Sequence, residues 1–97
     1  MEIKVHGSQV EIKGNIKTPE NYMAIKEHVQ RIVDKGTNDI QFIIEDSLSM
    51  TSSVIGYLMK LVNVDKVQIN MQIRDKRLIE LMEELDLVRL FGVKKIT

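Results

Sequence analysis

The first residues of the chain alternate between apolar and polar side chains over two short stretches. Ile3 and Val5 stand between polar neighbours, and after residues 7–8 (GS) the alternation resumes at Val10 and Ile12. A period of two residues predicts strands with one buried and one solvated face, and a short turn that contains glycine predicts a hairpin. We therefore expect a β-hairpin at the start of the chain.

A helical spacing follows. Thr18 and Pro19 stand where an N-cap and a first helical residue are expected, and Gly36 follows the last turn as the expected C-cap. The apolar residues between them form one stripe and are Tyr22, Ile25, Val29, Ile32 and Val33. This spacing predicts an amphipathic helix.

The second half of the chain alternates between expected strands and helices. The nearly continuous apolar run at residues 40–44 is typical of a central strand that helices cover on both faces. Alternation over residues 67–73 predicts another strand flanked by helices, and residues 93–96 a final short one. One helix is expected to begin near Ser52, and Asp75 is expected to cap another. The side chains expected to face inward are Ile55, Leu58, Met59 and Val62 in the first of these helices and Leu78, Ile79, Leu81, Met82 and Leu85 in the second.

These elements predict one α/β domain over residues 1–97, with the order ββαβαβαβ. A chain of 97 residues is too short for two independent cores. Right-handed crossovers through the helices make successive strands parallel, so the hairpin and the crossovers together give a mixed sheet. Such folds place ligands or partners at the carboxyl ends of their parallel strands, and the loop from Glu45 to Thr51 lies at one of these ends.

Charge and composition exclude several classes of function. The 14 basic and 14 acidic residues cancel, so no long-range field gathers nucleic acid or acidic membranes. The chain has no cysteine, which excludes disulfides and thiolate metal sites and fits a reducing compartment. Because the first residues lack a signal-peptide core and no apolar run is long enough to span a membrane, we expect a cytoplasmic protein without membrane insertion.

No group of residues suggests an enzyme. The sequence contains no glycine-rich phosphate loop, no metal-ligand set and no nucleophile with its base, so we expect no catalytic residue, metal or cofactor. His6 and His28 lack partners at metal-binding spacing and are expected to be solvated. Glu45 and Asp46 are adjacent at a strand end, so their carboxylates should point to opposite faces.

One long segment resembles the signature of a known family. Residues 43–56, IIEDSLSMTSSVIG, resemble the STAS domain (sulphate transporter and anti-sigma factor antagonist), in which an apolar strand and a loop precede a helix opened by Asp-Ser-Ser-Gly-Leu-Gly. Residues 14–17 (GNIK), 78–82 (LIELM) and 87–91 (LVRLF) stand where the family has further characteristic segments. The resemblance implies a STAS-like mixed sheet with helices packed against it. The family's C-terminal helix is expected to be absent, because the sequence ends near its last strand.

The resemblance also implies a function in bacterial signalling and transcription regulation. Anti-sigma factor antagonists of this family bind an anti-sigma factor that is also a serine kinase, and the kinase phosphorylates the serine after the motif's aspartate. That position is Ser52, with Ser53 and Thr51 as second choices. The residues expected to bind the partner are Asn15, Lys17, Ser49, Met50, Thr51, Ser52, Ser53, Val54 and Tyr57. Met50 is expected to lie exposed at this interface.

Two interpretations of the serines remain open. A phosphoserine at a helix N-terminus is stabilised by free backbone N–H groups and the helix dipole, and its charge changes the affinity for a partner. Alternatively, these hydroxyls only cap the helix. Thr51 and Lys17 replace acidic residues of the family, and Val54 replaces a glycine. These differences favour a STAS subunit of a signalling or lipid-transport complex that is never phosphorylated. The oligomeric state is left open between a monomer and a weak dimer.

Overall fold

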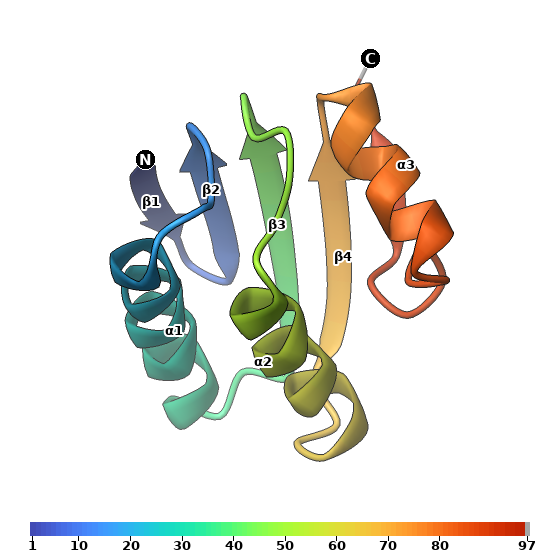
Figure 1. The fold of residues 1–97 in the computed structure, drawn as a ribbon. Helices are drawn as coiled ribbons and strands as arrows, with labels where there is room; N and C mark the ends of the chain where they lie inside the picture. Colours follow the sequence, from blue (N-terminus) through green and yellow to red (C-terminus); the bar gives the residue numbers. More distant parts are fainter. Residues whose placement is uncertain (97) are drawn as a thin grey trace.

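The chain forms a five-stranded β-sheet with three helices against it (Figure 1). The computed structural model describes residues 1–96. Its strands are β1 (Glu2–His6), β2 (Gln9–Lys13), β3 (Asp39–Glu45), β4 (Gln68–Ile73) and β5 (Val93–Lys95). Its helices are α1 (Pro19–Asp34), α2 (Ser52–Asn63) and α3 (Lys76–Glu84). The predicted α/β class and the order of elements are confirmed.

The strands lie in the sheet in the order in which they occur along the chain, β1-β2-β3-β4-β5. β1 is antiparallel to β2, and every other neighbouring pair is parallel, as predicted for a mixed sheet. Phe42 in the centre of β3 pairs with Val10 of β2 and Met71 of β4. This topology brings the carboxyl ends of β2, β3 and β4 to the same edge.

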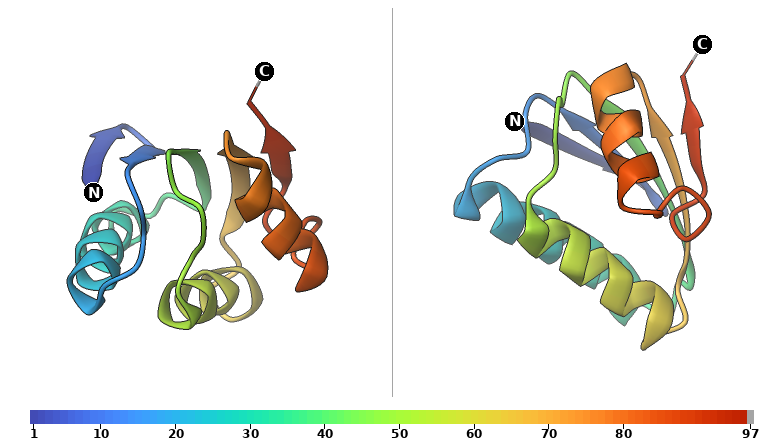
Figure 2. Two further views of the ribbon diagram at one scale, coloured as in Figure 1. Left: turned by 45° about the horizontal axis from the view of Figure 1, so that its top comes forward. Right: turned by 45° about the vertical axis from the view of Figure 1, so that its right-hand side comes forward.

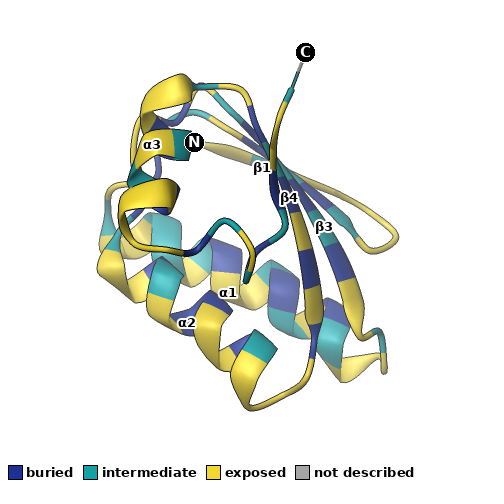
Figure 3. Ribbon diagram, turned by 90° about the vertical axis from the view of Figure 1, so that its right-hand side faces the viewer, coloured by how far each residue is buried: buried dark blue, intermediate teal, exposed yellow. Residues whose placement is uncertain are grey.

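All three helices lie on one face of the sheet, as both views in Figure 2 and the side view in Figure 3 show. The prediction that helices cover β3 on both faces was therefore wrong. Ile40, Phe42 and Ile44 are buried beneath the helices, whereas Ile43 is half-buried on the open face, between Glu11 and Gln72 of the neighbouring strands. One isoleucine on the open face made the run look continuous. The flanking of β4 by helices is likewise limited to one face.

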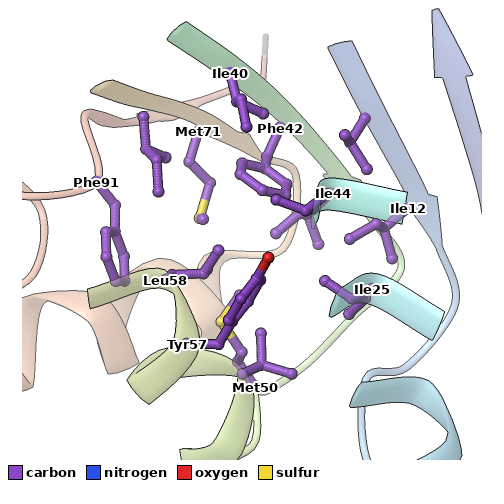
Figure 4. Packing of buried hydrophobic residues seen from close by; sticks show 14 of the residues in the cluster. Ile12, Ile25, Ile40, Phe42, Ile44, Met50, Tyr57, Leu58, Met71 and Phe91 are labelled. Carbon is purple, nitrogen blue, oxygen red and sulfur yellow. The ribbon is translucent and has the colours of Figure 1, made fainter. Parts of the chain in front are cut away.

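The core fills the space between this sheet face and the helices (Figure 4). Phe42 and Met71 extend from the sheet toward Leu58 of α2. Ile25 of α1 packs at the side of the core that lies next to β2. Phe91, in the turn between α3 and β5, is fully buried and closes the opposite side. Every element except β1 contributes a buried side chain, and β1 adds the half-buried Ile3; this burial stabilises the arrangement of the elements.

The buried stripe of α2 differs from the predicted one. Met59 is 36% exposed, and the buried positions of this helix are Val54, Tyr57, Leu58 and Leu61. Because α2 carries apolar residues almost all round, two stripes with the same helical spacing exist in its sequence, and spacing alone does not decide between them. In α3, Leu78 and Met82 are buried as predicted, whereas Leu85 is 47% exposed beyond the last turn.

The predicted N-caps Thr18 and Asp75 are confirmed, whereas the C-cap of α1 is Lys35 and not the predicted Gly36. Thr18 caps α1, and Gly36 adopts a φ of 90° just after the helix. Asp75 caps α3 by accepting a hydrogen bond from the backbone N–H of Arg77 at 2.8 Å. Within residues 1–96, no helix combines the length and the apolar character that a membrane span requires.

Candidate functional site

Two loops meet at the carboxyl ends of β2 and β3. One loop, residues 14–18, connects β2 to α1, and the other, residues 46–51, connects β3 to α2. The backbone N–H of Gly14 donates to the carbonyl of Glu45 at 3.0 Å, so the loops are joined where they leave the sheet. In Figures 1 and 2 they run side by side toward the starts of the two helices.

Ser47 joins these loops more firmly. Its side chain is 1% exposed; its hydroxyl accepts from the backbone N–H of Ile16 at 3.1 Å and donates to the carbonyl of Ser49 at 2.7 Å. Alongside, the N–H of Leu48 donates to Oδ1 of Asn15 at 3.1 Å. Sequence reasoning missed Ser47, because no local pattern shows which serine of a polar stretch points inward.

The helix that follows, α2, begins with a single cap. Thr51 has an extended backbone, and its hydroxyl accepts from the N–H of Val54 at 3.3 Å. The first turn of α2 contains no acidic residue. Ser52 and Ser53 are exposed, and within residues 1–96 neither hydroxyl forms a hydrogen bond. Two hydroxyl groups that form no hydrogen bond within residues 1–96 therefore lie beside the positive end of the α2 dipole.

The structure brings several of the predicted partner-binding residues together. Asn15, Ser49 and Thr51 lie in the joined loops, and Ser52 and Ser53 open the helix directly after them. Lys17 is exposed in the first loop, where its backbone N–H donates to Oδ1 of Asn21 at 3.0 Å. These residues share one end of the molecule.

Three of the predicted partner-binding side chains are instead in the core. Met50, Val54 and Tyr57 are 6%, 1% and 6% exposed, and Figure 4 shows Met50 and Tyr57 pointing inward. The expectation that Met50 is exposed was wrong. Met50 lies in the same loop as Ser47, whose hydrogen bond to Ile16 holds the loop against the domain, and its apolar side chain is buried beneath the start of α2. Val54 and Tyr57 belong to the buried stripe that helical spacing did not single out.

Tyr57 connects α2 to α1. Its hydroxyl donates to Oε1 of Gln30 at 2.9 Å, and its ring packs edge-to-face on Tyr22 with 6.4 Å between centroids. Burial raises the pKa of Tyr57 to about 12, so this phenol remains protonated and keeps donating at physiological pH. Tyr57 therefore has a structural role.

The solvent-exposed side of α2 and its preceding loop carries mostly small side chains and few charges. Gly56 lies on the exposed side of α2, and a methyl group placed there would meet no atom of residues 1–96 within 4 Å apart from its chain neighbours and the surrounding helix backbone. Leu48 and Met59 are 41% and 36% exposed. We define the α2 surface as six uncharged exposed residues of the helix and its preceding loop, which exposed Asp46 and Lys60 border: Leu48, Ser49, Ser52, Ser53, Gly56 and Met59.

Other candidate chemistry is sparse. Among residues 1–96, no group of three or more His, Asp or Glu side chains is placed to hold a metal ion. His6 is exposed, with Nε2 3.6 Å from Oε2 of Glu11. His28 is half-buried rather than solvated, because its Nδ1 lies 2.8 Å from the carbonyl of Ala24. The side chain of Glu45 lies 3.4 Å from that of Arg74. These contacts are surface pairs of ordinary kind.

Comparison with known proteins gives no match. No family model matches the chain, and no curated protein or solved structure does. The resemblance to the STAS domain rests on the order and spacing of the residues quoted above. The α2 surface presents hydroxyls and two apolar side chains on a fixed backbone, which suits binding.

Proposed function

We propose that this chain is a STAS-like protein-binding module of the anti-sigma factor antagonist type. Its α2 surface binds an anti-sigma factor that is also a serine kinase, and phosphorylation of Ser52 by that kinase switches the binding. The observation that carries this proposal is the position of Ser52. It is the first residue of α2, it is exposed, and the neighbouring Thr51 already supplies the cap.

A phosphate on Ser52 is compatible with the folded chain. It adds about −1.5 to −2 charges beside free N–H groups and the positive end of the helix dipole, without displacing a hydrogen bond. No residue of α2 before Lys60 carries a charge, so a phosphate on Ser52 changes the start of this helix from neutral to anionic. A partner that buries this surface when it is neutral must then desolvate the phosphate, which lowers its affinity.

The experiment that tests this function is phosphosite mapping of the protein isolated from its native cells, before and after phosphatase treatment. We expect one phosphate, on Ser52, that the variant Ser52→Ala no longer carries and the matched variant Ser53→Ala retains. Phosphate at another residue, or none under any growth condition, would contradict the switch.

A second candidate function is a constitutive scaffold subunit. The observation that favours it is the pair of hydrogen bonds through Ser47 and Asn15, which holds the α2 surface in one shape without any modification. Under this alternative, Ser52 is never phosphorylated. The variant Met59→Glu, which places a charge on the α2 surface, should nevertheless abolish binding to the native complex, as measured by co-purification. Ser52→Ala leaves that complex unchanged.

A further inference from the structure

A groove separates α3 from β5 at the edge of the sheet. It encloses about 340 Å³, and its apolar lining comes from Ile79 of α3, Val88 of the following turn and Val93 of β5. Figure 2 shows β5 (red) beside α3 (orange) in both views, on the side of the sheet farthest from β1. Ile79 and Val88 are half-buried, so an incoming side chain would reach them.

Along the outer edge of β5, the N–H of Val93 donates to the carbonyl of Val88 at 2.9 Å, and the edge is open from Lys95 onward within residues 1–96. The carbonyl of Gly92 accepts from Met71 at 3.2 Å, and the N–H of Ile96 donates to Ile73 at 3.0 Å. Because backbone groups alternate in direction along a strand, the N–H and C=O of Lys95 turn away from β4. Within the described residues 1–96, β5 is the last strand of the sheet and pairs with β4 alone. Such an edge is a template for another strand.

The charges around this edge are unevenly distributed. Lys94 and Lys95 are exposed on β5, whereas α3 lines the same groove with one lysine, Lys76, and two acidic side chains, Glu80 and Glu83, so the unpaired positive charge lies on β5. Only Lys76 has an acidic neighbour within contact range in the described residues, Glu80 at 4.0 Å. A second copy of this chain that pairs along β5 would bring its own lysines against Lys94 and Lys95, which opposes self-association. The same lysines attract carboxylates.

We propose that β5 and this groove bind an extended, acidic segment of a partner protein, which adds a strand to the sheet. The backbone of the segment pairs with Lys95, one of its apolar side chains enters the groove between Ile79 and Val88, and its carboxylates lie beside Lys94 and Lys95. This surface is separate from the α2 surface and does not depend on the phosphorylation of Ser52.

Two synthetic peptides test the proposal, each titrated into the isotope-labelled full chain and followed by NMR. In the acidic probe, valine and threonine alternate between terminal glutamates, and in the basic probe lysines replace the glutamates. We expect the acidic probe to shift the amide signals of β5 and to slow hydrogen exchange at Lys95. Lys94 is the internal control, because its N–H already faces β4. The basic probe should bind at least several-fold more weakly.

Charge-reversal variants distinguish binding at this site from nonspecific binding. The double variant Lys94→Glu/Lys95→Glu should weaken the acidic probe by about 3- to 10-fold and favour the basic one, since each exposed pair contributes modestly. The matched variant Lys26→Glu/Lys35→Glu, on and just after α1, should bind the acidic probe like the unchanged chain. Equal binding of both probes, shifts away from β5, or a dimer in sedimentation that contacts through β5 would each overturn the proposal.

Discussion

The helices α1 and α2 begin at the same edge of the sheet, yet their N-termini are built differently. At α1, the hydroxyl of Thr18 accepts from the N–H of Asn21 at 3.1 Å, and the side chain of Asn21 accepts from the N–H of Thr18 at 3.2 Å. Pro19 and Glu20 complete a favourable first turn. At α2, one longer bond to Thr51 stands alone, without an acidic residue. The start of α1 is complete in itself, whereas that of α2 leaves its positive end open to an added negative charge.

The start of α2 is held in place mainly by the loop before it and less by its cap. Ser47 connects this loop to the other loop through Ile16, and the contact lies outside the helix itself. The chain thus fixes the position of Ser52 without using the hydroxyl of Ser52. The two helix starts are therefore stabilised by different contacts, and substitutions can test this difference.

The largest expected effect is that of Ser47→Ala. This change leaves the buried N–H of Ile16 without its acceptor, which costs about 1–3 kcal/mol of the free energy of unfolding. Urea denaturation followed by circular dichroism measures the loss. The control is Ser49→Ala, an exposed serine whose side chain should contribute less than about 0.5 kcal/mol. Equal stability of the two variants would mean that the loops are not held by Ser47.

Sequence reasoning predicted α1 more completely than the site, for a physical reason. The signals at Thr18, Pro19 and Gly36 are local, since each acts on backbone groups within a few residues. The contact of Ser47 with Ile16 spans 31 residues, and only the folded sheet brings the two together. The element order was readable from periodicity, whereas the direction of Met50 required the three-dimensional structure.

The next effect compares the two caps directly. Thr18→Ala disrupts a reciprocal pair of hydrogen bonds and should cost about 1–2 kcal/mol, whereas Thr51→Ala removes one longer bond and should cost about 0.5–1 kcal/mol. Both values come from the same urea experiment. If Thr51→Ala were the more damaging change, the cap of α2 would be stronger than its geometry indicates.

A smaller effect of opposite sign is expected at Gly56. Alanine has a higher helix propensity, and its methyl group meets nothing in residues 1–96 beyond its chain neighbours and the surrounding helix backbone, so Gly56→Ala should stabilise the fold by about 0.5–1 kcal/mol. Thermal denaturation should show a higher midpoint. If a partner approaches the α2 surface closely, the same variant binds that partner more weakly although it is more stable. A loss of stability would instead reveal an internal need for this glycine.

The smallest effect tests the open positive end of α2 itself. Ser52→Asp places a carboxylate at the first helical residue, where the helix dipole favours the charged form and lowers the pKa of the carboxyl below its unfolded value. The gain, about 0.3–1 kcal/mol, is present above the unfolded pKa and is lost as the pH falls through the folded pKa.

Asn63→Asp, at the last residue of the same helix, puts the same charge at the negative end of the dipole and should destabilise the fold. High salt should reduce both effects. Opposite signs for the two aspartates would show that the N-terminus of α2 accepts negative charge because of where it lies, as a phosphate on Ser52 requires. Equal signs would remove that support while leaving the loops and the core as described.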